Sequence, residues 1–203
     1  MSIMYTYEND LYAKGYTAVC GTDEAGAGPL AGPVYAAAVI LDRDSVIDGL
    51  NDSKKLSEKK REKLFDEIIA KARAYAIVSI PESVIDDINI LNARMLAMRQ
   101  AVSELDITPD FLLVDGNRDP NAEVETLCVV GGDGKSASVA AASILAKVSR
   151  DRFMLKMAEE YPQYKFEKHK GYGTKVHIEA LRQFGPCPIH RRSFLKNICG
   201  GER

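Results

Sequence analysis

Three strand-like segments of this chain each end in, or next to, an acidic residue. The first ends at Asp23 and Glu24, the second at Asp115, and the third just before the loop that carries Asp133. In α/β proteins, reactive groups gather where the strands of the central sheet end, so we expect these carboxylates to lie together. Glycines flank these carboxylates at Gly21, Gly116, Gly132 and Gly134, so the backbone of a bound polymer could approach the carboxylates closely.

The rest of the chain alternates between strand and helix patterns. Apolar runs predict strands at 17–24, 34–41, 74–80, 111–114 and 127–130. Helical spacing predicts helices from Ser57 to Ala72, from about Ile90 to Leu105, from about 137 to 160, and near 174–184. This order predicts an α/β fold in which helices flank one central mixed sheet, with the Ala-rich segment 140–146 packed closely on it.

Length and composition place limits on the class of protein. A chain of 203 residues with 46% hydrophobic and 28% charged residues is typical of one globular domain. The longest apolar run, 34–41, is too short to cross a bilayer, and no secretion signal precedes it. The cysteines are widely spaced, which argues against zinc or redox chemistry, and we expect Cys20 and Cys128 to be buried. We therefore expect a cytoplasmic protein without membrane contacts.

The net charge of -2 is unusual for a protein that binds nucleic acid, so the distribution of charge matters more. Basic residues cluster at 54–63, 165–170 and 191–196. For 59–63 we favour a solvated helix face. The two later clusters, which include Lys170 and Arg191, lie among Gly, Tyr, His and Pro residues and are candidates for phosphate contacts.

Clustered carboxylates repel one another, and a divalent cation is the usual remedy. Oxygen ligands favour Mg²⁺ or Mn²⁺, and two such ions roughly 3.5–4 Å apart could clamp a phosphodiester. Neighbouring residues of a regular strand point to opposite faces, however. Asp23 is therefore the better candidate for a ligand shared by two ions, and the coordination of Glu24 is left open.

An ordered set of motifs spans the chain from about Ala18 to Phe194 and resembles the bacterial ribonuclease HII family, the type 2 ribonucleases H. The motifs are GTDEAGAGPLAGPV at 21–34, NDSKKLS at 51–57, INILNA at 88–93, LLVDGN at 112–117, GGDGKSASVAAASILAKVSRDR at 131–152, HKGYGTKVH at 169–177 and GPCPIHRRSF at 185–194.

The resemblance implies a ribonuclease H-like fold: one catalytic domain over 1–203, with a C-terminal helical extension for substrate binding from about 160. It implies Asp23, Glu24, Asp115 and Asp133 as catalytic residues and ligands of two Mg²⁺ or Mn²⁺ ions. Water would attack in line and leave a 3′-hydroxyl and a 5′-phosphate. The substrates would be RNA/DNA hybrids and duplex DNA with embedded ribonucleotides, cut on the 5′ side in ribonucleotide repair, by a monomer.

The resemblance also implies residues that recognise the substrate. Tyr172 matches a tyrosine that packs on a deoxyribose, although tyrosines also order glycine-rich loops. Lys54 matches a lysine near the scissile phosphate, and Lys170 is a further basic candidate. Gly26, Ala27 and Gly28 stand where the family usually has Gly-Arg-Gly, a loop whose backbone reads 2′-hydroxyls. Ala27 lacks the guanidinium, which predicts weaker and less salt-sensitive binding.

Other residues have structural interpretations. We expect Asp151 to be paired or exposed, Ser136 and Ser138 to cap the helix that follows Asp133, and His190 to order the C-terminal segment rather than act as a base. Three other functions are considered: a ribonuclease HIII, a catalytically weak protein that binds RNA/DNA hybrids, and a small-molecule phosphatase. An HIII enzyme would carry a sizeable N-terminal domain, whereas about twenty residues precede Asp23 here.

Overall fold

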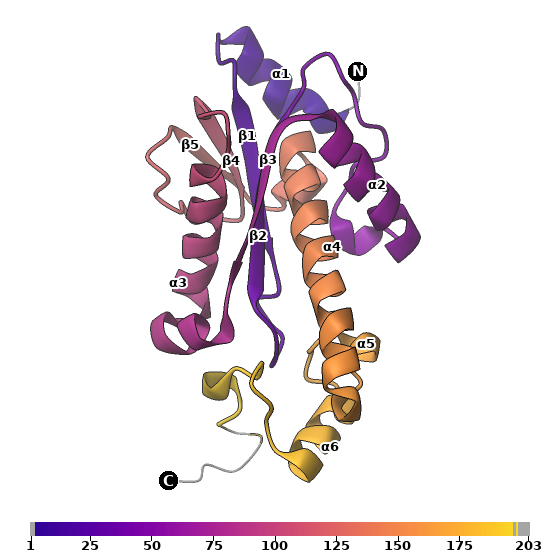
Figure 1. The fold of residues 1–203 in the computed structure, drawn as a ribbon. Helices are drawn as coiled ribbons and strands as arrows, with labels where there is room; N and C mark the ends of the chain where they lie inside the picture. Colours follow the sequence, from indigo (N-terminus) through magenta and orange to yellow (C-terminus); the bar gives the residue numbers. More distant parts are fainter. Residues whose placement is uncertain (1–2, 197, 199–203) are drawn as a thin grey trace.

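The structure, a computed structural model, describes residues 3–196 and 198, and these form a five-stranded sheet in the order β3-β2-β1-β4-β5 (Figure 1). The strands are β1 (Val19–Ala25), β2 (Val34–Leu41), β3 (Ala72–Ile80), β4 (Phe111–Asp115) and β5 (Thr126–Val129). β1 pairs antiparallel with β2, and β2 with β3, whereas β4 runs parallel to both β1 and β5. The predicted mixed sheet is confirmed.

Helices cover both faces of the sheet. The α-helices of the described residues are α1 (Thr6–Ala13), α2 (Glu58–Lys71), α3 (Glu82–Ser103), α4 (Ala137–Glu160), α5 (Phe166–His169) and α6 (Lys175–Phe184). Short 3-10 turns occupy Ile3–Tyr5, Ser53–Lys55, Gly132–Gly134, Pro162–Tyr164 and Arg192–Phe194. Figure 1 shows α3 on one face of the sheet, α4 with α2 on the other, and α5 and α6 beyond its lower end.

Alternating residues of β1 and β2 build two cores. Cys20, Ala36 and Ala38 pack with α3, whereas Ala37 and Val39 pack with α2 and α4. The Ala-rich segment 140–146 of α4 is buried, as predicted. Helix and strand approach so closely that a Cβ atom on Gly21 would lie 2.2 Å from the backbone carbon of Ser138.

Two helices differ from the prediction. α3 begins at Glu82, but Asn89 interrupts it with φ 65° and ψ 161°. The Asn89 Oδ1 atom accepts hydrogen bonds from the backbone N–H of Leu91 and Asn92, so it caps the second half of the helix, whose start matches the predicted one. No pattern in the sequence predicted α1.

The side chain of Glu8 attaches α1 to the start of α4. Its Oε1 atom accepts hydrogen bonds from the backbone N–H and the hydroxyl of Ser138 and from the hydroxyl of Ser136. Ser136 caps α4 as predicted, because its Oγ atom accepts from Val139 N. The prediction that Ser138 also caps the helix is wrong, because its hydroxyl donates to Glu8 instead.

The C-terminal extension has its own small core, which includes Leu30, Met154, Tyr164, Phe166 and Leu181. A chain of neutral hydrogen bonds crosses this core. His190 Nδ1 accepts from Cys187 N, and its Nε2 lies 2.9 Å from His177 Nε2. His177 Nδ1 in turn donates to the carbonyl of Tyr172. His190 is buried and orders this segment, in line with the prediction.

We expect acid to destabilise the extension. Burial lowers the pKa of both His177 and His190 to about 4, below the ordinary value of 6.5. A histidine whose pKa falls on folding contributes stability above about pH 6.5, and that stability is lost as the pH falls towards 4. These two rings should therefore lower the unfolding temperature between pH 7 and pH 5. Because buried carboxyls such as Asp133 titrate with the opposite effect over the same range, the contribution of the rings is measured as the difference between the parent and a variant that lacks one of them.

The variant His177→Gln provides the control for this pH effect. It should be less stable at pH 7 but show a flatter pH dependence, because glutamine can bond to the Tyr172 carbonyl without titrating. Identical pH profiles for the variant and the parent would contradict the assignment to these rings.

Among the described residues, no helix has the length and apolar character needed to cross a membrane.

Candidate active site

The side chains of Asp23 and Glu24, both in β1, point to opposite faces of the sheet. Asp23 is buried on the α4 side, near the hydroxyl of Ser143, which opposes the rise of its pKa. Glu24 lies on the α3 side, where its Oε1 atom is 2.5 Å from Nη2 of Arg94. The predicted difference between the two residues is therefore present, and Arg94 accounts for the orientation of Glu24.

Asp115 and Asp133 lie on the same side as Asp23. Phe111 and Leu113 of β4 pack with Val139 of α4, and Asp115 continues that alternation at the end of the strand. Its Oδ1 atom accepts a hydrogen bond of 2.7 Å from Gly132 N. This bond folds the loop before α4 onto the end of β4 and brings Asp133 next to the other carboxylates.

The site concentrates negative charge in a poorly hydrated place. Burial raises the pKa of Asp23 well above its usual range, and the charges of Glu24 and Asp115 add to the effect. Burial together with Asp115 and Asp52 raises the pKa of Asp133 to about 6. Burial also raises the pKa of Glu24, although Arg94 opposes it. These shifts are typical of carboxylates that lack a neutralising cation.

A cavity of about 250 Å³ opens over Asp23. Its lining includes most of the residues that were predicted to bind substrate: Gly26, Ala27, Gly28, Lys54 and Tyr172. Burial acts to lower the pKa of Lys54, but the charges of Asp133 and Asp23 outweigh it and raise that pKa. Lys170 is not among these lining residues, because its Nζ atom donates to the carbonyl of Glu167.

Tyr172 and the glycine loop face each other across this cavity. Tyr172 is 45% exposed, and a Cβ atom on Gly28 would lie 3.8 Å from its ring. The guanidinium of Arg150 lies 6.0 Å from the centre of the same ring. An exposed aromatic ring beside a glycine leaves room for a flat or narrow group between them.

Two buried arginines fix the shape of the glycine loop. Arg191 donates to the carbonyls of Gly26, Ala27 and Gly32, at 2.6–3.0 Å. Arg150 donates to three further carbonyls, those of Ala31, Pro33 and Lys170. The prediction of Arg191 as a phosphate contact is wrong, because its guanidinium is buried and used by the protein itself.

Several lesser predictions can be compared with the structure. Asp151 is paired as expected, at 2.7 Å from Lys147 Nζ. Arg61 departs from the predicted solvated face, because it donates to the carbonyls of Ser53 and Leu56. Cys20 is fully buried, whereas Cys128 is only partly buried.

The donor set fits a hard divalent cation. All four candidate ligands are carboxylates, and the Oε2 atom of Glu24 is buried without a hydrogen-bond partner. Within residues 3–196 and 198, no three Asp, Glu, His or Cys side chains converge closely enough to hold a metal ion by themselves. The pairing of Glu24 with Arg94 explains part of this separation, because it holds Glu24 on the α3 side.

Arg94→Met should lower the stability of the metal-free protein and increase the stabilisation that Mg²⁺ provides. The change leaves the Glu24 charge without its counter-ion, at a cost of about 1–2 kcal/mol for a pair that is partly exposed. It also removes a cation that competes with the metal for Glu24. Urea unfolding with EDTA or with saturating Mg²⁺ measures both effects.

Arg94→Lys, which keeps the charge, is the matched control and should behave more like the parent. A smaller Mg²⁺ stabilisation in Arg94→Met than in the parent would show that Arg94 orients Glu24 for the metal instead of competing with it.

The site contains residues that sequence reasoning did not select. Ser143 lies near Asp23 and opposes the rise of its pKa, Ser53 bonds to Ser143 at 2.9 Å, and Lys147 lines the cavity. Ser53 and Ser143 lie inside the quoted motifs, and this position was the only indication in the sequence that they belong to the site. Arg94 carried none, because a single arginine on an amphipathic helix normally faces water.

The sequence and the fold match those of known proteins. Residues 20–197 match the family described as Ribonuclease HII. Ribonuclease HII of Caldicellulosiruptor bescii is 57% identical over 194 residues, which cover 96% of this chain and 94% of that protein. Ribonuclease HII of Idiomarina loihiensis is 61% identical over 176 residues, with 87% and 94% covered.

A solved structure agrees with these relatives. The crystal structure of ribonuclease H2 from Pyrococcus horikoshii OT3 superposes with a TM-score of 0.73 at 30% identity, and the match covers 87% of this chain and 93% of that one. The predicted ribonuclease H-like fold is therefore confirmed. With a family match over most of its length and close relatives that share the name, this chain belongs to the ribonuclease HII family of ribonuclease H enzymes.

Proposed function

We propose that this protein is an endonuclease that cuts the RNA strand of RNA/DNA hybrids and incises on the 5′ side of ribonucleotides embedded in duplex DNA. The observation that carries the proposal is the grouping of Asp23, Asp115 and Asp133 on one side of the sheet, with Glu24 reaching the same site from the other. The cavity above Asp23 adds the glycine loop and Tyr172. Family membership supports the choice of substrate.

The carboxylates would hold two Mg²⁺ or Mn²⁺ ions, which supply an activated water and stabilise the charge that builds up on the scissile phosphate. Asp23, which is buried between the other carboxylates, would contribute to both ion sites. Glu24 would contribute its free Oε2 atom, since Arg94 occupies Oε1. Lys54 would contact the phosphate. Its burial acts to lower its pKa, but the nearby carboxylates raise that pKa by more, so the side chain stays charged.

Recognition would rest on shape. The loop Gly26–Ala27–Gly28 would present backbone groups to the 2′-hydroxyls. Arg191 holds its conformation by binding the carbonyls of Gly26 and Ala27, and Arg150 binds carbonyls of the segment that follows. Tyr172 would pack on the next deoxyribose, where the lack of a 2′-hydroxyl permits close contact. We also propose one catalytic domain that acts as a monomer in the cytoplasm, with residues from about 160 serving as its substrate-binding extension.

Incision of a DNA duplex that contains one ribonucleotide tests the proposal, with an all-DNA duplex as the control. The expected result is a single cut on the 5′ side that requires Mg²⁺ or Mn²⁺ and leaves 3′-hydroxyl and 5′-phosphate ends. Binding without cleavage in either metal would instead support a protein that recognises hybrids without cutting them.

Ala27→Arg should lower KM and make it more sensitive to salt. A guanidinium at this position would gain a charge-assisted contact with a phosphate, worth about 1.5–3 kcal/mol in favourable cases. Steady-state cleavage at two salt concentrations measures the effect. Ala13→Arg, at the exposed end of α1, adds the same charge elsewhere and should change little. Equal effects of the two variants, or none, would refute this explanation of the atypical loop.

A further inference from the structure

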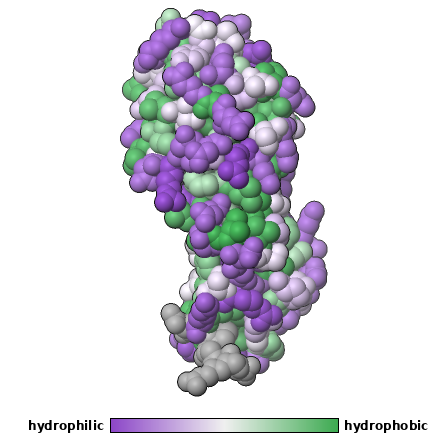
Figure 2. Space-filling model, turned by 90° about the vertical axis from the view of Figure 1, so that its left-hand side faces the viewer, coloured by the Kyte–Doolittle hydropathy of each residue, from purple (hydrophilic) through white to green (hydrophobic). Residues whose placement is uncertain are grey.

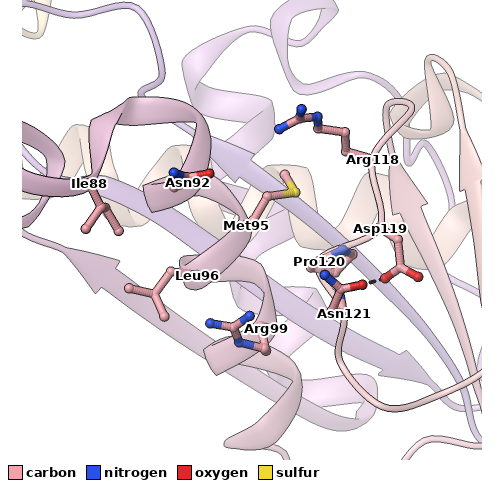
Figure 3. Close-up of a pocket in the computed structure, with 9 residues that line it drawn as sticks. All are labelled: Ile88, Asn92, Met95, Leu96, Arg99, Arg118, Asp119, Pro120 and Asn121. Atoms are coloured by element: carbon pink, nitrogen blue, oxygen red, sulfur yellow. Dashed lines mark hydrogen bonds between the residues drawn. The ribbon is translucent and has the colours of Figure 1, made fainter.

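A second cavity, separate from the one above Asp23, lies on the α3 side of the sheet (Figure 3). It has a volume of about 500 Å³ and is formed by one face of α3 and the loop after β4. We name it the α3 groove and define it by three apolar residues and four polar ones that line it: Ile88, Met95, Leu96, Asn92, Asn121, Arg99 and Arg118. Both arginines are exposed.

The groove carries positive charge that the protein does not neutralise. Within the described part of the chain, neither Arg99 nor Arg118 forms an ion pair. Asp119 also lines the groove, and its Oδ1 atom accepts a hydrogen bond of 2.7 Å from Asn121 N. Two guanidiniums against one carboxylate leave a net positive site, rich in donors, that suits an anion.

The groove borders the active site on the side of Glu24. Arg118 follows Asp115 by three residues, which can span at most about 10 Å. Arg99 lies about 7.5 Å along α3 from Arg94, the partner of Glu24. A polymer that leaves the active site on this side would meet the groove within a few repeating units.

The floor of the groove differs from its rim. In Figure 3 the side chain of Met95 lies between the two arginines, with Leu96 and Ile88 to one side along α3, and Figure 2 shows an apolar area on this face of the molecule below a largely hydrophilic upper part. Guanidiniums bind phosphates through paired hydrogen bonds, whereas an apolar floor suits the carbon face of a sugar. This combination matches a sugar-phosphate backbone better than an apolar protein segment.

We propose that the α3 groove binds the backbone of the nucleic acid substrate a few nucleotides from the scissile bond, with Arg99 and Arg118 on phosphates. The inference rests on the proposed function and adds a substrate contact on the α3 side. Each phosphate contact displaces counterions, so the groove should contribute to the salt dependence of binding.

The double variant Arg99→Gln/Arg118→Gln tests the proposal. Binding to a labelled duplex with one ribonucleotide is measured by fluorescence anisotropy between 50 and 200 mM salt, in the Asp23→Asn background so that the duplex stays intact. Loss of two contacts should reduce the slope of log affinity against log salt by about 2. Lys14→Gln/Arg43→Gln is the control, because these exposed residues lie at or beyond the opposite end of β1 and should leave the slope unchanged.

Shortening the duplex on one side of the ribonucleotide, then on the other, identifies the strand segment. When the duplex is shortened on the side that reaches the groove, the double variant and the parent should show the same salt slope. When it is shortened on the other side, their salt slopes should still differ. An unchanged slope, an equal loss in the control pair, or a difference that survives both truncations would overturn the proposal. Failure of the parent to bind or cut the duplex would instead refute the proposed function.

Discussion

Asp23→Asn is expected to abolish metal-dependent cleavage while making the metal-free protein more stable. Asparagine cannot supply the negative charge that a shared metal ligand needs, so activity should fall by about a thousandfold or more, the scale on which groups that stabilise transition-state charge act. Cleavage of a duplex with one embedded ribonucleotide at saturating Mg²⁺ measures the loss.

The stability gain follows from the pKa of Asp23, which burial and the neighbouring Glu24 and Asp115 raise well above its usual range. A carboxyl whose pKa rises on folding adds stability at low pH, and that stability is lost as the pH rises through the folded value. At pH 7 the charged side chain therefore destabilises the metal-free fold, and its removal should add at least about 1 kcal/mol. Urea unfolding in EDTA at pH 5 and pH 8 should show a larger gain at pH 8.

Asp66→Asn on the exposed face of α2 is the control for both measurements and should change neither. A loss of activity without any gain in stability would mean that Asp23 carries no unbalanced charge in the metal-free protein. An active Asp23→Asn enzyme would remove Asp23 from the catalytic site altogether.

The sequence predicted the sheet well because its strands follow strong local rules. Strands β2 and β4 are nearly continuous apolar runs with turn residues close to their ends, and Ser57 and Ser136 mark the starts of α2 and α4. α1 escaped notice because it buries only Leu11 and Glu8. Its attachment depends on the bond between Glu8 and the start of α4, a contact between residues 128 to 130 positions apart that no local pattern records.

The site shows a similar division. Four carboxylates beside glycines predicted a charged cluster, and strand alternation predicted that Asp23 and Glu24 would differ. The alternation could not reveal that Arg94 holds Glu24, because that contact depends on how α3 packs. Basic residues were harder still. Arg191 and a phosphate-binding arginine look the same in a sequence, and burial against three carbonyls separates them.

Arg191→Met should lower the stability of the fold and weaken substrate recognition. The side chain is fully buried, and burial lowers the pKa of Arg191 to about 9, so it remains charged at pH 7. Methionine fills much of the same volume but leaves the carbonyls of Gly26, Ala27 and Gly32 without their donor. An unpaired buried polar group costs about 1–3 kcal/mol, so a loss of about 3 kcal/mol or more is expected.

The consequence for function follows from where those carbonyls lie. Gly26 and Ala27 belong to the loop that would read the 2′-hydroxyls, so loss of its shape should raise KM for the ribonucleotide-containing duplex more than it lowers kcat. Arg182→Met, an exposed change on α6 of the same extension, is the matched control and should affect neither. Measurements at 15 °C, well below the expected unfolding transition, separate loop disorder from global unfolding. An unchanged KM in folded Arg191→Met would mean that the loop holds its conformation without this arginine.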